Sequence, residues 1–201
     1  SLTAACGVDA LTHCIEAYTV QLHQPITDAL ALKGISMIAE NLEKAYENGE
    51  DREARRNMMI ASTIGGMAFI SSNVGAVHAF AETVGAWFDT PHGVANSLFL
   101  PYIMEFNIPA CPERFADIAD AMGIEREESM SDEQYALKAV EYVKALNRKL
   151  NIPTIKEIKG ITEERFEAIA ERSANNVLSN DNARKITKED YLELLKKAYN
   201  E

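Results

Sequence analysis

The stretch "TAACGVDALTHCIEAYTV", residues 3–20, decides the fold class, because apolar residues occupy most of its circumference when it is drawn as a helix. A helix that is apolar on nearly all sides is typical of the centre of a domain. Thr3 is expected to cap its start. Asp9 and His13 lie four residues apart in this run, so they share one helix face. The stretch therefore predicts a buried helix with a carboxylate and an imidazole side by side.

The rest of the chain shows the same helical period and almost no period-two alternation. Thr90 is a candidate N-cap before Pro91, and Thr187 is followed by acids, as helix starts commonly are. We expect one all-α domain over residues 1–201 with roughly eight to ten helices. The segments expected to be helical are 3–20, 25–49, 51–72, 74–88, 89–107, 112–123, 131–151, 162–176 and 187–201.

Composition excludes several classes of function. Among 201 residues, 47% are hydrophobic, and 31 acidic residues against 20 basic ones give a net charge of −11. Nucleic-acid binding rests on clustered Lys and Arg, so no nucleic-acid partner is expected. Three cysteines without a CxxC pair favour a reduced, cytoplasmic setting. No secretion signal and no apolar run long enough for a membrane span is apparent, so no membrane partner is expected.

Three of the four histidines lie in apolar or conformationally restricted segments. His78 stands among apolar residues, His92 lies between Pro91 and Gly93, and His13 has Asp9 on its own face. Each alone has a plain interpretation, such as a core histidine or a helix-stabilising Asp–His hydrogen bond. Together, three imidazoles and one carboxylate suit Fe²⁺ or Zn²⁺. The fourth, His23, lies in a polar loop and is assigned no role.

Longer strings of the sequence resemble a known family. "TAACGVDALTHCIEAYTV" and "GAVHAFAETVGAWFDTPHGVANSLFLP", with "TDALAL" and "NARKITKEDYLELLKKAY", are similar to the signatures of the iron-containing (group III) alcohol dehydrogenases. The resemblance implies that Asp9, His13, His78 and His92 bind the metal. It also implies that the chain is the all-α C-terminal domain of a two-domain, dehydroquinate synthase-like fold. The N-terminal NAD(P)-binding α/β domain is then expected to be absent from this chain, since no Gly-rich phosphate loop occurs in it.

The function that the resemblance implies is NAD- or NADP-dependent interconversion of primary alcohols and aldehydes at Fe²⁺ or Zn²⁺. Glu82 stands where many members have a histidine, and it is a candidate for contact with the nicotinamide or for proton transfer. Phe69, Val74 and Leu178 are candidates for a substrate-pocket wall, and no cofactor-binding residue is assigned. The full-length protein is expected to be a homo-oligomer, and this chain alone is expected to be inactive.

Several alternatives stay open from the sequence. A glycerol dehydrogenase-like enzyme or a dehydroquinate synthase-like lyase would belong to the same superfamily. A metal-dependent helical phosphohydrolase would need adjacent His–Asp pairs, and the sequence has none. An isolated helical module without activity is the remaining alternative.

Overall fold

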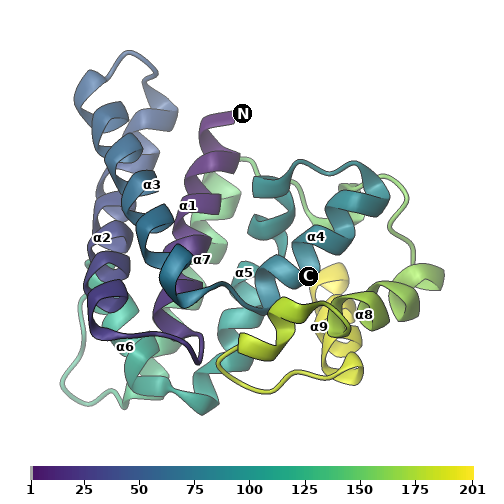
Figure 1. Ribbon diagram of the computed structural model, residues 1–201. Coiled ribbons are helices and arrows are strands. Elements are labelled where there is room, and N and C mark those ends of the chain that lie inside the picture. Colours follow the sequence, from purple (N-terminus) through teal and green to yellow (C-terminus); the bar gives the residue numbers. More distant parts are fainter. Residues whose placement is uncertain (1) are drawn as a thin grey trace.

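The computed structural model describes residues 2–201, and within them every regular element is a helix, which confirms the all-α fold class (Figure 1). The α-helices are α1 Leu2–Thr19, α2 Pro25–Glu47, α3 Arg52–Ser72, α4 Ala76–Phe88, α5 His92–Asn107, α6 Pro112–Ala121, α7 Asp132–Lys149, α8 Phe166–Ala174 and α9 Lys188–Asn200. Four short 3₁₀ helices connect them: η1 Ile108–Ala110, η2 Ile155–Glu157, η3 Glu163–Arg165 and η4 Val177–Asp181.

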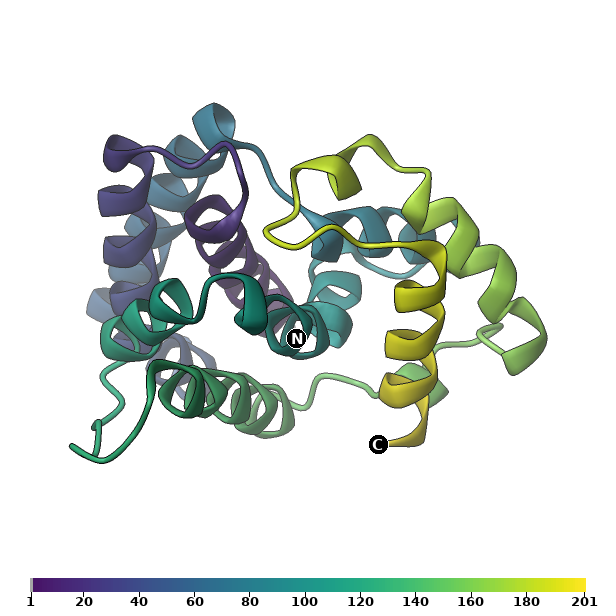
Figure 2. The same cartoon turned by 90° about the horizontal axis from the view of Figure 1, so that it is seen from below.

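Helix α1 runs through the middle of the molecule. It packs against α2 and α3 on one side and against α5 on the other (Figure 1). The view from below shows α6 and α7 packed side by side at the lower left, with α4, α8 and α9 on the α5 side (Figure 2). Helix α1 therefore separates two groups of helices and contacts both, as its all-round apolar surface predicts.

Small residues let the helices pack closely against α1. A Cβ atom at Gly34 of α2 would lie 2.5 Å from the Sγ atom of Cys14, so only glycine fits at this crossing. Cys14 itself is fully buried, and burial raises the pKa of its thiol to about 12. The central helix is held by shape as well as by apolar area.

The predicted helix caps are confirmed at one position and wrong at two. Thr187 forms a reciprocal capping box with Asp190 at the start of α9. Thr3 lies inside α1, because the helix already includes Leu2. Thr90 makes no cap either: its hydroxyl is buried and has no hydrogen-bond partner among residues 2–201, and Pro91 occupies the N-cap position of α5.

The start of α4 is capped by side chains from distant segments. Its N-cap residue, Gly75, has no side chain to offer. The amide of Ala76 donates to Oδ1 of Asn182 at 3.3 Å, and the amide of Val77 donates to Oε1 of Glu16 at 2.8 Å. Asn182 is in turn fixed by a reciprocal amide pair with Asn107. These contacts set the position of α4 relative to α1 and α5.

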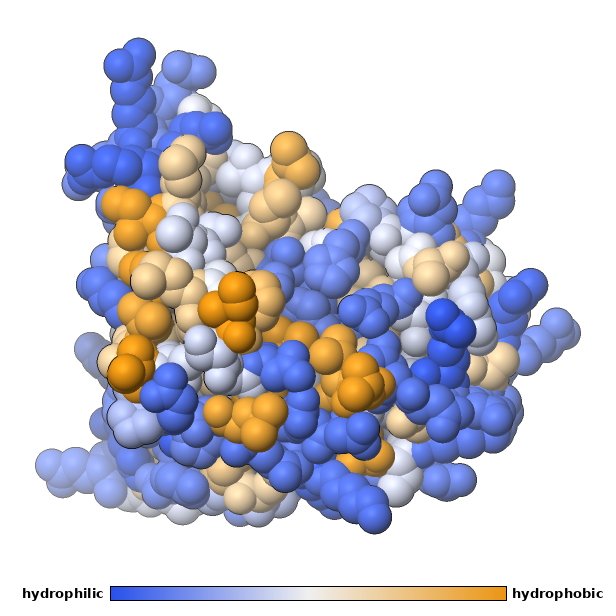
Figure 3. Space-filling model, viewed as in Figure 1, coloured by the Kyte–Doolittle hydropathy of each residue, from blue (hydrophilic) through white to orange (hydrophobic). Residues whose placement is uncertain are grey.

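Apolar side chains gather on the α2–α3 side of the surface in Figure 3. Exposed apolar residues of these two helices include Ile26, Met59, Met67 and Ile70. Within residues 2–201, no single helix is long and apolar enough to cross a membrane. Helices α3 and α4 reach that length and composition only as a pair, which is bent by 106° at the break.

Candidate metal centre

Three of the four residues predicted to bind a metal, Asp9, His78 and His92, bring donor atoms together at the junction of α1, α4 and α5, and His13 lies beside His78. Helix α1 contributes Asp9 and His13, α4 contributes His78, and α5 contributes His92 as its first residue. The Nε2 atoms of His13 and His78 are 3.1 Å apart, and Nε2 of His92 is 3.7 Å from Oδ1 of Asp9. One donor atom each from Asp9, His78 and His92 lies within 4.8 Å of the other two. This spacing suits ligands of one ion.

A close backbone approach brings His92 to the other donors. A Cβ atom at Gly93 would overlap the carbonyl group of Ala5 in α1 and would lie 3.2 Å from Cβ of Asp9. Glycine removes that obstacle, so the first turn of α5 rests directly on the backbone of α1. The close contact between α1 and α5 therefore adds His92 to the pair that Asp9 and His13 form on α1.

Hydrogen bonds at Nδ1 decide which nitrogen of His13 and His78 faces the cluster. Nδ1 of His13 lies 2.9 Å from the carbonyl oxygen of Asp9, and Nδ1 of His78 lies 2.5 Å from Oε2 of Glu16. Both partners only accept, so each Nδ1 carries the hydrogen. The two Nε2 atoms are left to face each other with their lone pairs. At 3.1 Å this contact is favourable only if a proton or a metal ion lies between them.

The surrounding charges favour a cation at this point. Burial and the neighbouring His78 lower the pKa of His13. Burial alone would also lower the pKa of His78, but the hydrogen bond and charge of Glu16 outweigh it, so the pKa of His78 is raised. The cluster thus attracts positive charge at His78 and keeps His13 neutral, as a metal ligand must be.

Sequence reasoning missed Asn96, which lies one turn after His92 on α5. Its side chain is fully buried, and Nδ2 lies 2.6 Å from Oδ1 of Asp9, 3.0 Å from Nε2 of His92 and 3.2 Å from Nε2 of His78. Its Oδ1 atom has no hydrogen-bond partner within residues 2–201. If the amide turned over, Oδ1 would lie among the donor atoms, where a cation would compensate it. The residues present therefore fit a divalent ion.

Glu16 was also missed, although it stands in the same apolar run as Asp9 and His13. Glu16 is 3% exposed, and its carboxylate accepts hydrogen bonds from the Val77 amide and from Nδ1 of His78. The available signal was its spacing: Glu16 follows His13 by three residues, so it lies on a neighbouring face of α1.

The cluster is buried at one end and open at the other. The side chain of His78 is 5% exposed, those of His13 and Asp9 are 18% and 23% exposed, and that of His92 is 48% exposed. A purely structural metal site is usually closed on all sides, whereas a catalytic one keeps an open position. The opening beside His92 is the side from which a small molecule can approach.

The remaining predicted site residues occupy different surroundings. The Phe69 ring lies 4.5 Å from the His13 ring, centroid to centroid. Val74 is buried in the segment between α3 and α4, and Leu178 is partly buried on η4. Glu82 is exposed, and its Oε2 accepts a hydrogen bond from Asn176 at 2.7 Å. Phe69 alone of these four is placed beside the cluster by a measured contact.

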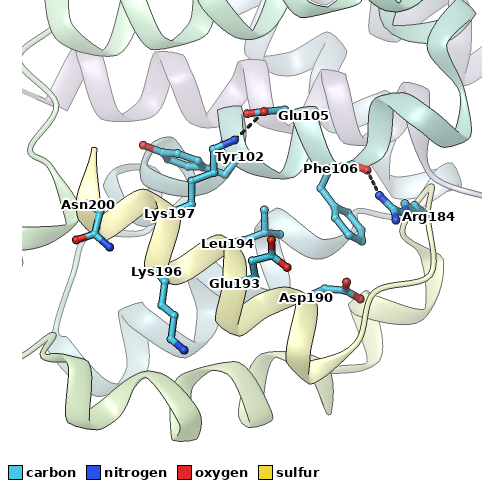
Figure 4. Close-up of a pocket in the computed structure, with 10 residues that line it drawn as sticks. All are labelled: Tyr102, Glu105, Phe106, Arg184, Asp190, Glu193, Leu194, Lys196, Lys197 and Asn200. Atoms are coloured by element: carbon cyan, nitrogen blue, oxygen red, sulfur yellow. Dashed lines mark hydrogen bonds and ion pairs between the residues drawn. The ribbon is translucent and has the colours of Figure 1, made fainter.

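A separate groove lies between α5 and α9 (Figure 4). Its volume is about 580 Å³, and its lining includes one ion pair, Lys197 with Glu105 at 2.7 Å, and one hydrogen bond from Arg184 to the carbonyl oxygen of Phe106 at 3.0 Å. Tyr102 in its wall follows His92 by ten residues of α5, which is about 15 Å along the helix. The groove and the histidine cluster are different places on the molecule.

Comparison with known proteins places these features in a family. Residues 3–199 match the sequence model of the family described as "Fe-containing alcohol dehydrogenase family, C-terminal". Alcohol dehydrogenase 4 of Saccharomyces cerevisiae is 43% identical over 202 residues, covering 99% of this chain and 51% of the yeast protein. The 1,3-propanediol dehydrogenase of Citrobacter freundii is 40% identical, with 98% and 51% covered. The chain thus spans about half the length of the curated relatives it matches.

Solved structures agree with these relatives. A crystal structure of 1,3-propanediol oxidoreductase superposes with a TM-score of 0.94 at 39% identity, over 98% of this chain and 51% of that one. An alcohol dehydrogenase from Oenococcus oeni gives a TM-score of 0.94 at 40% identity, with the same coverage of both chains.

Proposed function

The chain belongs to the iron-containing alcohol dehydrogenase family, and from this premise we propose that it supplies the metal-binding part of an NAD(P)-dependent alcohol dehydrogenase. The enzyme would interconvert primary alcohols and aldehydes. One observation carries the proposal: the Nε2 atoms of His13 and His78 face each other at 3.1 Å, and each Nδ1 is already occupied as a donor. The family supplies the reaction class, and this geometry supplies the place for a divalent ion.

We assign the ligands as Asp9, His13, His78 and His92. Three ring nitrogens and one carboxylate oxygen suit Fe²⁺ or Zn²⁺, and the carboxylate partly neutralises the ion. Asp9 and His13 come from adjacent turns of α1, so that helix holds half of the set. His78 and His92 add one donor each from α4 and α5. The ion would thus join three helices at a point open to solvent on the His92 side.

A divalent ion bound at this point supplies Lewis-acid polarisation of the substrate oxygen. The chain's own residues determine how a substrate reaches it. Because His78 is buried and His92 is the most exposed of the four residues, a small alcohol would approach from the His92 side. The Phe69 ring beside His13 would then form one apolar wall of the entrance. Val74 and Leu178 stay proposals for further parts of that wall.

The nicotinamide cofactor would be carried mainly by the α/β domain of the longer protein, which the resemblance implies. Glu82 lies one turn after His78 on α4, and its carboxylate is exposed and held by Asn176. We propose it as the residue of this chain nearest the nicotinamide side, where a carboxylate can accept or pass on a proton. Among the relatives, names such as 1,3-propanediol dehydrogenase, butanol dehydrogenase and lactaldehyde reductase favour short alcohols and diols as substrates.

The test uses the longest gene product that contains this chain, purified without oxygen. Bound iron and zinc are measured by elemental analysis, and a panel of alcohols is assayed with NAD⁺ and NADP⁺. His92→Ala removes the exposed ligand and should lower metal content and activity together. His23→Ala is the matched control, because His23 is a loop histidine paired with Asp28 away from the cluster. Full metal content in the His92 variant would refute the ligand assignment.

A further inference from the structure

We propose that Glu16 is a positioning residue for the metal centre, which acts by holding His78 in the tautomer whose Nε2 faces the other donors. The inference rests on the proposed function for the identity of the site, but its geometry stands independently. Glu16 lies on α1 and His78 on α4, and Oε2 of Glu16 is 2.5 Å from Nδ1 of His78. The pair is almost completely buried, with side chains 4% and 5% exposed.

The carboxylate of Glu16 is fixed before it reaches His78. Its other oxygen, Oε1, accepts the amide hydrogen of Val77 at 2.8 Å, and that amide is one of the unpaired donors at the start of α4. A Cβ atom at Gly75 would lie 3.2 Å from Oε1, so the backbone closes around the carboxylate there. A carboxylate anchored to a helix terminus cannot turn away, and the ring of His78 is held by a rigid partner.

The number of donors and acceptors requires a carboxylate at this position. Two N–H groups, one from the Val77 backbone and one from the His78 ring, point at two acceptor oxygens. Glutamine has the same size but only one acceptor oxygen and an NH₂ group. If the glutamine oxygen keeps Val77, the NH₂ group faces Nδ1 of His78. The ring must then move its hydrogen to Nε2, and the lone pair leaves the metal centre.

Glu16 also brings a negative charge to its histidine, whereas the group that holds His13 is neutral. Nδ1 of His13 is held by the neutral carbonyl of Asp9 at 2.9 Å. With Asp9, Glu16 brings two negative charges to the surroundings of one divalent ion, so the buried group is neutral as a whole. A carboxylate behind a ligand imidazole orients the ring and increases its basicity, and loss of such a partner weakens metal binding by roughly 10–100-fold.

The experiment compares wild type, Glu16→Gln, Glu16→Asp and Glu40→Gln. Glu40 is an exposed carboxylate of α2 whose side chain accepts a hydrogen bond from Ser36, remote from the histidine cluster in the hydrogen-bond pattern, so it is the matched control. The Kd for Co²⁺ is measured by titration. The tautomer of His78 is read from ¹⁵N shifts of the protein without added metal, and circular dichroism reports folding.

We expect Glu16→Gln to remain helical, to bind Co²⁺ about 10–100-fold more weakly, and to shift His78 from the Nδ1–H to the Nε2–H tautomer. Glu16→Asp keeps the charge and should recover part of the affinity, whereas Glu40→Gln should match wild type. An unchanged tautomer with a Kd within about twofold of wild type would overturn the proposal. If Glu16→Gln does not fold, an Nε2–H tautomer of His78 in the wild type overturns it equally. A wild type that binds no metal but shows the Nδ1–H tautomer refutes the proposed function and retains only the part of this inference that assigns the His78 tautomer to Glu16.

Discussion

The histidine cluster and the α5–α9 groove both involve helix α5, and they are opposite kinds of site. The groove is an open hollow in which Lys197 and Glu105 already form an ion pair. The cluster brings ring nitrogens and the Asp9 carboxylate to one centre, where the Nε2 atoms of His13 and His78 face each other and Oδ1 of Asn96 has no hydrogen-bond partner within residues 2–201. In this molecule, the volume of a hollow is therefore a weaker sign of chemistry than several donor atoms held close to one point.

The largest effect should come from removing the buried imidazole. His78→Ala takes away one ligand and leaves the Glu16 carboxylate buried without its partner, which should cost about 3–5 kcal/mol of unfolding free energy. Metal affinity should fall by more than about 100-fold, beyond the effect of losing a supporting residue. Denaturant unfolding and a Co²⁺ titration measure both. Lys197→Ala in the groove is the control, because it breaks a half-exposed ion pair and should cost under about 1 kcal/mol.

The second prediction concerns addition and removal of the ion. At a free ion concentration of 100 times the Kd, Zn²⁺ or Co²⁺ should stabilise the fold by about 2.7 kcal/mol, and a chelator should reverse the effect. Thermal unfolding with and without the ion measures the shift. Lys197→Ala should show the full shift and His92→Ala should show almost none. Equal shifts in these two variants would mean that the ion binds outside the cluster.

A smaller effect is expected from Asn96→Asp. The change places a second carboxylate oxygen where Nδ2 now lies 2.6 Å from Oδ1 of Asp9. When a chelator keeps the protein free of metal, this substitution should lower the unfolding free energy by roughly 1–3 kcal/mol, because a hydrogen bond becomes a contact between like charges. Added Zn²⁺ should recover most of the loss. Asn200→Asp in the groove wall is the matched substitution, and the difference between its unfolding free energy and that of wild type should be the same with and without the ion.

The smallest effect lies beside the groove, at Glu201. The hydrogen bond from Lys144 lowers the pKa of Glu201. A lowered folded-state pKa means that the ion pair stabilises the fold above the unfolded pKa of about 4.3 and loses that contribution as pH falls through the folded value. The side chain is 42% exposed, so solvent screening keeps the contribution well under about 1 kcal/mol. Wild type and Glu201→Gln should therefore differ slightly in thermal stability near pH 6 and converge near pH 3.

Most of the fold could be predicted from sequence period, because the helices are amphipathic or wholly apolar. The contact between Asp9 and His13 followed from a spacing of four on one helix. The approach of His92 did not follow from spacing, since it depends on Gly93 resting on the backbone of Ala5. Family resemblance, rather than periodicity, linked His78 and His92 to the pair on α1.

The residues that sequence reasoning missed share a physical cause. Glu16 and Asn96 each lie in an apolar helix, where a single polar residue is easily taken for an exposed one. Their partners are distant in sequence: Glu16 meets His78 across 62 positions, and Asn96 meets Asp9 across 87. The misplaced caps at Thr3 and Thr90 have a related cause, because helix boundaries were judged from local residues alone.

The capping of α4 by distant side chains has a consequence for how the protein folds. The amide of Ala76 is capped by Asn182, 106 positions later in the sequence. The amide of Val77 is capped by Glu16, 61 positions earlier. Closing loops of this length is slow compared with forming a helix, so the segment that carries His78 should acquire its final pose late. A nascent or proteolysed chain that stops before residue 182 would hold all three cluster histidines but lack the Asn182 side chain that caps α4.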